Sequence, residues 1–340
     1  MIVVGIESSC DECSVAVVKD GRSVLSNVIA TQIEFHKPYS GVVPEIASRK
    51  HVEWIMDVYN RALKEAGISS CDIDVVAATN RPGLMGSLVV GFSFAKGLAM
   101  GLEKPLVAVD HIKAHLYAPH LEYDISYPFI GLLLSGGHTV ISMVNSFDDF
   151  EVMGTTIDDA CGEAFDKVAK HFGWGYPGGV VIDRMAEKGC DTAFSFPDSV
   201  LKKDKHTYDV SYSGIKTAVV YQLEQFKNPG YESSPENIAA SFRKAAIDMV
   251  LKRLDRAVND TGIKRVVLGG GVAANSYLRR VLTEKKHEGW EVFFPSMELC
   301  TDNGAMVAAI AYEYAIRGRF DSLESGVSAR VPDFKPYSSK

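Results

Sequence analysis

The chain has 340 residues, which is enough for about two compact units of ~150 residues each. Hydrophobic residues make up 46% and charged residues 23%, values that are typical of a soluble globular enzyme and exclude a disordered or fibrous chain. No run approaches the ~18 apolar residues of a membrane helix, and the start, MIVVGIESSC, lacks the basic segment of a signal peptide. Six cysteines are too few for a disulfide framework, so we expect a reducing, cytoplasmic setting.

The net charge of −7 is unevenly distributed along the chain. Residues 201–290 carry 16 Lys and Arg against 10 Asp and Glu, so the remainder is strongly acidic. A pI near 5.8 argues against a protein that binds nucleic acid by itself through charge. Two interpretations of the basic segment stay open: solvated helix faces, or a contribution to a shared nucleic-acid surface.

A strand–turn–strand pattern occurs twice. It covers IVVGI, ESSCDEC and SVAVV (2–18), followed by the hairpin-type turn KDG, and later FIGLLL, SGGH and TVISMV (129–144). Each central turn exposes backbone N–H groups and hydroxyls that can bind an anion. A third element, residues 265–282, is a strand that ends in three glycines and leads into a helix, whose N-terminus favours negative charge.

Helices and further strands lie between these elements. Val52, Ile55, Tyr59 and Leu63 predict one apolar face of a helix over 49–66, which Gly67 ends. We also expect strands at 75–79 and 106–109, helices at 87–101, 235–258 and 303–316, the last capped by Thr301 or Asp302, and an irregular segment at 173–215.

Strands that alternate with helices indicate an α/β protein. The two hairpin-type turns and the glycine-rich turn resemble the duplicated actin-like ATPase (ASKHA) fold, in which two lobes with mixed sheets enclose a cleft. We expect residues 1–110 and 303–330 to form the N-terminal lobe and residues 111–302 the C-terminal lobe.

The sharpest chemical signal is VDHIKAHLYA, in which His111 and His115 are four residues apart. On a helix the two imidazoles face the same side and can share one metal ion. A zinc protease needs Glu directly after the first His, and Ile112 stands there instead. A carboxylate is the expected third ligand, and Asp302 can supply it, although the sequence by itself favours an ordinary helix cap at Asp302. His36, His51 and His138 have no paired spacing.

Other groups carry weaker signals. Cys10 and Cys13 form a single CxxC, which we interpret as ordinary turn residues. Asp159, Glu163 and Asp166 lie at nearby helical positions, where one can face a ligand hydroxyl or all can be solvated. The glycines of YPGG (176–179) can pack against a flat ligand or simply form a loop corner.

Eight motifs occur in an order that resembles the bacterial TsaD family of tRNA N6-adenosine threonylcarbamoyltransferases, formerly described as Gcp or O-sialoglycoprotein endopeptidases. The resemblance runs over residues 2–317. The motifs are GIESSCDE, SGVVPEIASRKH, DHIKAH, LLSGGHT, DDACGEAFDKVAK, YPGG, GGGVAAN and CTDNGAM. Small departures from the family pattern are Cys13 for threonine, Ser40 for glycine, and Val180 and Val181 after YPGG.

The resemblance implies the two-lobed fold and a set of site residues. His111, His115 and Asp302 match ligands of one divalent metal per subunit, usually iron, with zinc or magnesium as alternatives. The implied substrate-binding residues are Leu134, Ser135, Gly136, Gly137, His138, Asp166, Gly179, Asp183 and Asn275.

The implied reaction moves threonylcarbamoyl from threonylcarbamoyl-AMP to the N6 amine of the adenosine next to the anticodon in tRNAs that read ANN codons, and releases AMP. The donor is already activated, so no covalent enzyme nucleophile is needed. No general base is assigned, and His138 and Asp11 are the candidates. The backbone N–H groups of Gly136 and Gly137 can stabilise developing oxyanion charge.

The resemblance also implies partner subunits, namely a TsaB-like paralogue and a TsaE-like ATPase. The tRNA would then lie on a composite surface, in agreement with the unexceptional overall charge. From this chain we expect contributions by Lys202, Lys203, Lys205, Arg279, Arg280, Lys285 and Lys286.

Three competing functions are weighed against this one. A sugar kinase or another carbamoyltransferase can share the fold, but a kinase would use Mg²⁺ held by carboxylates and water rather than by a histidine pair. A non-enzymatic paralogue should lack the metal ligands, and this chain has them. A glycoprotein endopeptidase would work outside the cell and lacks the required Glu.

Overall fold

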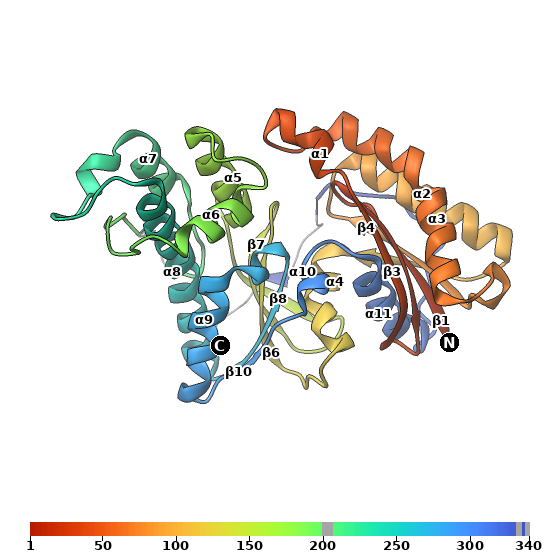
Figure 1. Ribbon diagram of the computed structural model, residues 1–340. Helices are drawn as coiled ribbons and strands as arrows, with labels where there is room; N and C mark the ends of the chain where they lie inside the picture. The colour runs from red at the N-terminus through yellow and green to blue at the C-terminus, as the bar shows by residue number, and fades with distance from the viewer. Residues whose placement is uncertain (199–206, 331–334, 337–340) are drawn as a thin grey trace. The chain divides into compact units, whose positions relative to one another are not determined.

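The computed structural model in Figure 1 describes residues 1–198, 207–330 and 335–336. Contacts divide the chain into two compact units, Met1–Ile125 with Pro295–Phe334, and Ser126–Phe294 with Lys335–Lys340. The sequence prediction gave residues 111–125 and 295–302 to the other lobe. The structure keeps them in the first unit because α4 (His111–Tyr117) starts directly after β5 (Leu106–Asp110) and packs against α11 (Gly304–Ala315).

The first unit is built on a five-stranded sheet with the order β3-β2-β1-β4-β5. The first three strands form an antiparallel meander, and β4 and β5 run parallel to β1. Val4 on β1 lies opposite Val17 on β2 and Val76 on β4, so the apolar run of the first strand is at the centre of the core. The strands are Ile2–Glu7 (β1), Glu12–Lys19 (β2), Ser23–Thr31 (β3), Val75–Arg81 (β4) and Leu106–Asp110 (β5).

Helices cover both faces of this sheet. Figure 1 shows α2 (Pro44–Ala66) and α3 (Met85–Leu102) on one side, where they pack on β2, β3 and β4, and α11 on the other side, where it packs on β1 and β2. By length and composition alone, α3 is apolar enough to cross a membrane; a third of it is buried, and it packs against α2 and β4. The short helices α1 (Ile33–His36) and α10 (Met297–Cys300) complete the unit.

Helix α2 differs from its prediction in two respects. It begins at Pro44 rather than near residue 49, because Pro44 occupies the first turn, where a missing N–H costs nothing. Its end at Gly67, in the left-handed conformation with φ of 67°, is as predicted. Ile55, Tyr59 and Leu63 are buried, but the prediction for Val52 is wrong. His51 takes the inward position in that turn, and Val52 faces outward.

The second unit repeats the same plan. Its sheet has the order β10-β9-β6-β7-β8-β11, so an antiparallel meander is again followed by two strands parallel to the first strand of the meander. The strands are Phe129–Leu134 (β6), Thr139–Val144 (β7), Phe150–Thr155 (β8), Arg265–Gly269 (β9), Glu291–Phe293 (β10) and Lys335–Pro336 (β11). The duplication predicted from the two hairpin patterns is confirmed.

The helices of the second unit are Cys161–Phe172 (α5), Gly178–Ala186 (α6), Ser213–Tyr221 (α7), Pro235–Thr261 (α8) and Ser276–Glu284 (α9). Ser234 caps α8 through the N–H of Asn237, and Gly262 ends it, close to the predicted limits. The segment 173–215 is less irregular than expected, because it contains α6.

Candidate functional site

Three side chains of the first unit converge where β5 leads into α4 and where α11 begins. Asp302 Oδ1 lies 3.0 Å from His115 Nε2 and 3.7 Å from His111 Nε2. One ligand atom from each residue lies within 4.8 Å of the others, and both imidazoles are buried. Atoms at this spacing can coordinate one shared ion.

Helix capping places the two histidines. Asp110, the last residue of β5, accepts hydrogen bonds from the N–H groups of Ile112 (3.0 Å) and Lys113 (3.2 Å), so α4 begins at His111 without an intervening loop. His115 then lies one turn later on the same face, and the two ring centroids are 4.5 Å apart.

The start of α11 places the carboxylate. Gly304 packs so closely against Gly5 of β1 that a Cβ on either residue would collide with the carbonyl oxygen of the other. Ser14 Oγ also accepts the N–H of Gly304 at 2.9 Å. These contacts hold Asp302 and Asn303, the two residues before α11, against the first strand of the sheet. Asp302 is thereby brought to His115, although the two residues are 187 positions apart in the chain.

Asp302 is not the helix cap that the sequence allowed. The capping residue of α11 is Asn303, whose Oδ1 accepts the N–H of Met306 at 3.0 Å. The prediction of a Thr301 or Asp302 cap is therefore wrong. Since Asn303 caps the helix, the Asp302 carboxylate is directed at the imidazole of His115 instead.

A fourth residue at this site, Glu7, was missed. It ends β1 and is fully buried, and its Oε2 lies 3.1 Å from His111 Nδ1. The carboxylate also accepts the Thr79 hydroxyl and the Ser9 N–H, both at 2.6 Å. The sequence did contain a signal for Glu7, since it directly follows the apolar run IVVGI. A carboxylate at the end of a buried strand requires partners, which indicates a polar site nearby.

Charge is balanced tightly around the histidines. Burial by itself lowers the pKa of His111, but the charges of Glu7 and Asp302 raise it to about 9. The pKa of His115 is lowered, by burial first and then by the charge of His111. The two carboxylates therefore stabilise a positive charge at this pair of imidazoles, which either a second proton on His111 or a bound cation can supply. Two imidazole nitrogens and one carboxylate oxygen form the donor set of non-haem iron(II) sites, so the residues present fit a divalent transition metal.

The other histidines singled out in the sequence have different contacts. His51 Nε2 lies 2.9 Å from the carbonyl oxygen of Cys10, and His36 Nδ1 accepts the N–H of Val43 at 3.3 Å. His138 belongs to the second unit. Among the described residues, only His111, His115 and Asp302 form a cluster with metal-ligand spacing.

The predicted substrate loop follows β6 in the second unit. Leu134 ends the strand, and Ser135 and His138 close the turn: Ser135 N–H donates to His138 O at 2.8 Å, and His138 N–H donates to Ser135 Oγ at 3.0 Å. Gly136 and Gly137 at its tip are exposed, and their N–H groups have no partner among the described residues. The turn therefore presents two backbone donors.

The start of α5 supports this turn. Gly162 N–H donates to Ser135 O at 3.1 Å, and a Cβ at Gly162 would lie 2.9 Å from Gly136 Cα. Further along α5, Asp166 Oδ1 accepts the N–H of Gly178 at 2.7 Å, which ties α5 to the first turn of α6, where Gly179 lies. Of the acidic cluster, Asp159 and Glu163 instead form ion pairs with Lys167.

Asp183 on α6 is held by several donors. Its Oδ1 accepts hydrogen bonds from Asn275 Nδ2 (3.0 Å), Arg243 Nη1 (2.9 Å) and Ser276 Oγ (3.0 Å), and its Oδ2 accepts the Ser276 N–H (3.0 Å). Two predicted substrate residues, Asp183 and Asn275, are thus in direct contact. Because a carboxylate oxygen accepts about two hydrogen bonds, Oδ2 is the atom with remaining capacity.

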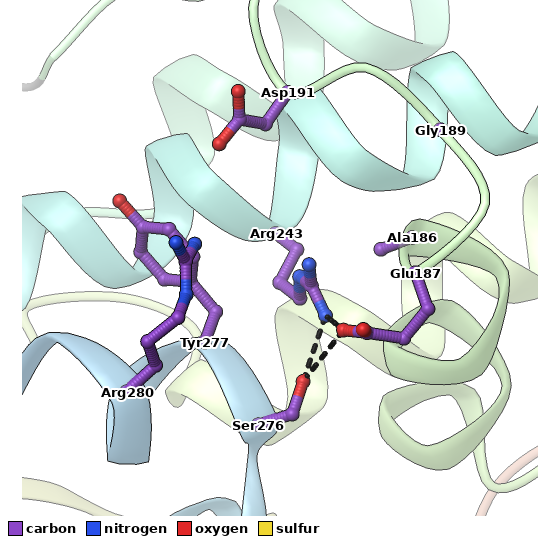
Figure 2. Close-up of a pocket in the computed structure, with 8 residues that line it drawn as sticks. All are labelled: Ala186, Glu187, Gly189, Asp191, Arg243, Ser276, Tyr277 and Arg280. Carbon is purple, nitrogen blue, oxygen red and sulfur yellow. Dashed lines mark hydrogen bonds and ion pairs between the residues drawn. The ribbon is translucent and has the colours of Figure 1, made fainter.

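Figure 2 shows the part of this network formed by Arg243, Glu187 and Ser276. Arg243 Nη1 also donates to Glu187 Oε1 (2.6 Å), and Ser276 Oγ donates to the same oxygen (2.9 Å). Arg243 was not foreseen from the sequence. These residues line a cavity of about 440 Å³ with Ala186, Gly189, Asp191, Tyr277 and Arg280. The hydrogen-bond network that orients Asp183 therefore forms part of the wall of this cavity.

The predicted tRNA-contacting residues fall into three groups. Lys202, Lys203 and Lys205 lie outside the described residues. Two others have partners within the chain: Arg279 donates to the Ala273 carbonyl (2.8 Å), and Lys285 pairs with Asp255 and Glu288. Arg280 and Lys286 are exposed.

The repeated α/β units define the class of protein. The chain has the actin-like ATPase fold, with TM-scores of 0.65 to full-length HypF (17% identity, 94% of this chain, 47% of that chain) and 0.54 to component A of (R)-2-hydroxyglutaryl-CoA dehydratase from Acidaminococcus fermentans (16% identity, 93% and 99% of the two chains). At these identities the likeness shows the fold alone.

The family is shown by the sequence comparisons. The family model TsaD, tRNA N6-adenosine threonylcarbamoyltransferase, matches residues 23–309. Proteins of that name are 58% identical in Treponema denticola, over 98% of both chains, and 49% identical in Borrelia hermsii, over 98% of both chains. The chain therefore belongs to the TsaD family and is a transferase of tRNA modification, which excludes the kinase, scaffold and endopeptidase alternatives.

Proposed function

We propose that the chain transfers the threonylcarbamoyl group of threonylcarbamoyl-AMP to the N6 amine of the adenosine next to the anticodon, in tRNAs that read ANN codons, with release of AMP. A divalent metal held by His111, His115 and Asp302 assists this transfer. The convergence of the two histidines of α4 with Asp302, which lies 187 residues after His115, carries the proposal.

The donor set favours iron, with zinc as the alternative. Magnesium takes oxygen ligands and water, so two imidazoles in a set of three make it the least suited of the three ions. When bound, the ion supplies a Lewis acid that can polarise a carbonyl or phosphate oxygen.

Residues of the second unit are proposed to bind the donor. The N–H groups of Gly136 and Gly137 can donate to an oxyanion as its charge develops. Asp183 Oδ2 can accept a hydrogen bond from a ribose hydroxyl, and Asn275 and Arg243 keep that carboxylate in place. The amine of a base is a weak nucleophile, so positioning by such contacts should supply much of the rate. His138 and Asp11 remain the candidates for the base.

Partner subunits are proposed to cover part of the first unit. Val52 and Met56 on α2, and Met85 and Val89 on the adjacent α3, are 45–65% exposed. Apolar side chains gathered on neighbouring helices are typical of protein interfaces and fit a TsaB-like paralogue. The proposal of a TsaE-like ATPase as a second partner rests on the family alone. All six cysteines are free, in agreement with a cytoplasmic setting.

The test combines the purified chain, unmodified tRNA, synthetic threonylcarbamoyl-AMP and the partner proteins, with mass spectrometry of the digested nucleosides. We expect threonylcarbamoyl-adenosine with the native chain and none with Asp302→Asn. The control is Glu298→Gln on α10, an acid of the same segment that lies outside the cluster. Full product formation by a metal-free Asp302→Asn protein would refute the proposed site.

A further inference from the structure

The environment of Glu7 is unusual for a carboxylate. Its side chain is fully buried, and three donors converge on its two oxygens: the Ser9 N–H on Oε1, and the Thr79 hydroxyl and the His111 imidazole on Oε2. The Ser9 N–H follows β1 and the Thr79 hydroxyl lies on β4, so these two donors fix the carboxylate independently of His111.

His111 lies between two carboxylates that contact opposite ring nitrogens. Nδ1 faces Glu7 at 3.1 Å, and Nε2 faces Asp302 at 3.7 Å. Ser9 Oγ is a second neighbour of Nδ1, at 3.2 Å. An ionised carboxylate only accepts hydrogen bonds, so a neutral His111 beside Glu7 carries its proton on Nδ1 and leaves the lone pair of Nε2 directed toward His115 and Asp302.

We propose that Glu7 is a positioning residue for the metal ligand His111. This inference rests on the metal site of the proposed function. It selects the Nδ1–H tautomer of His111, fixes the orientation of the ring, and strengthens Nε2 as a ligand. Partners of this kind behind a metal-bound histidine typically change metal affinity by about 10–100-fold. Glu7 itself does not touch the ion or the substrate.

The substitution Glu7→Gln separates this role from simple space filling, because it keeps the shape of the side chain. If the amide nitrogen takes the place of Oε2, it donates to His111 Nδ1 and moves the imidazole proton to Nε2, where it opposes metal binding. If the amide nitrogen instead takes the place of Oε1, it meets the N–H of Ser9 as donor against donor. Either orientation loses a contact that the carboxylate makes.

The test measures zinc affinity by chelator competition on the full chain, without any activity assay. We expect Glu7→Gln to weaken zinc binding by about 10–100-fold. Glu12→Gln is the matched control, since Glu12 is a partly buried carboxyl at the start of β2 that accepts a hydrogen bond from the Thr31 hydroxyl and contacts neither histidine. It should leave the affinity within about threefold of the native value, below the range expected for a partner of the ligand.

Long-range ¹⁵N–¹H NMR of the zinc-loaded, ¹⁵N-histidine-labelled protein reads the tautomer directly. We expect an Nδ1–H proton on His111 in the native chain, with its signal shifted or lost in Glu7→Gln. A merely structural role for Glu7 would not move this signal. Native zinc affinity together with an unchanged His111 tautomer in Glu7→Gln would overturn the proposal.

Two further variants separate the outcomes. If Glu7→Gln does not fold, Thr79→Val, which removes one donor to Oε2, should weaken zinc binding in the same direction but less, and an unchanged affinity would refute the role of Glu7. His115→Ala tests the site itself: native zinc affinity in that variant would refute the metal site, whereas loss in His115→Ala but not in Glu7→Gln would refute only the inference about Glu7.

Discussion

Asp302 and Asn303 are adjacent in the chain and face different partners. Asn303 Oδ1 accepts the N–H of Met306 and begins α11, whereas Asp302 Oδ1 lies 3.0 Å from His115 Nε2. One residue therefore stabilises the helix, and the other lies in the cluster of candidate metal ligands. Substitution of Asn303 should therefore change stability, whereas substitution of Asp302 should change metal binding.

Asn303→Ala should lower the free energy of unfolding by about 1 kcal/mol, because it removes a helix cap. Asp302→Asn should leave the stability of the metal-free protein nearly unchanged but abolish stoichiometric metal binding. Thermal unfolding and metal analysis of the two variants, side by side, measure both quantities. Equal metal content in Asp302→Asn and the native chain would contradict this division.

The two histidines should also differ when removed. His115→Ala and His111→Ala should both lose the metal and the transfer activity. His111→Ala should in addition destabilise the metal-free protein, because Glu7 loses the imidazole that balances its charge, and breaking a buried ion pair costs about 3 kcal/mol or more. Denaturant unfolding in the presence of a chelator compares the variants, and equal stabilities would argue against a charged Glu7.

Gly162→Ala tests the support of the substrate loop. The added Cβ would lie 2.9 Å from Gly136 Cα and from Ser135 O, so the turn must shift. We expect a higher KM for threonylcarbamoyl-AMP and unchanged metal content. Gly214→Ala on α7 is the control, since a Cβ there meets nothing within 4 Å. A native KM for Gly162→Ala would show that the turn does not contact the donor.

Stability should fall in acid through His120. Burial lowers the pKa of His120 to about 4, whereas the unfolded chain titrates near 6.5. The unfolded state therefore binds the proton first, and the contribution to stability is complete above pH ~6.5 and falls by about 3 kcal/mol as the pH drops to ~4. His120→Phe, which keeps a ring stacked on Tyr117, should flatten this dependence in denaturant unfolding at several pH values. Identical pH profiles of both proteins would contradict the assignment.

Arg280 and Lys286 are the exposed, described members of the predicted tRNA surface, and neither forms an ion pair with another described residue. Reversing both charges should weaken tRNA binding and reduce the slope of log affinity against log salt by about 2, as expected for two phosphate contacts. Lys64→Glu, in the first unit, serves as the control. Filter binding at several salt concentrations measures the slope, and an unchanged slope would remove these residues from the surface.

Local patterns predicted the fold well. Strand alternation, turn residues and helix periods depend on neighbours in the sequence, so the two hairpins, the limits of α8 and the end of α2 at Gly67 could be anticipated. Val52 could not, because periodicity does not show which neighbour will take the inward position of a turn, and His51 does.

The site was predictable only in part. The four-residue spacing of His111 and His115 is a local signal, but the distinction between Asp302 as a cap and as a ligand depends on the backbone at the start of α11. Glu7 and Arg243 were missed because their partners lie far away in the chain, with His111 104 residues from Glu7. Long-range contacts of this kind leave no spacing pattern.

The repeated strand order has a consequence for how the two halves can be altered. The turn after the first strand of the first unit carries buried acids such as Glu7, whereas the corresponding turn of the second unit has the uncharged tip Ser135–Gly137. Because each turn is anchored in its own sheet, a substitution that changes the charge of the first turn leaves the backbone donors of the second in place.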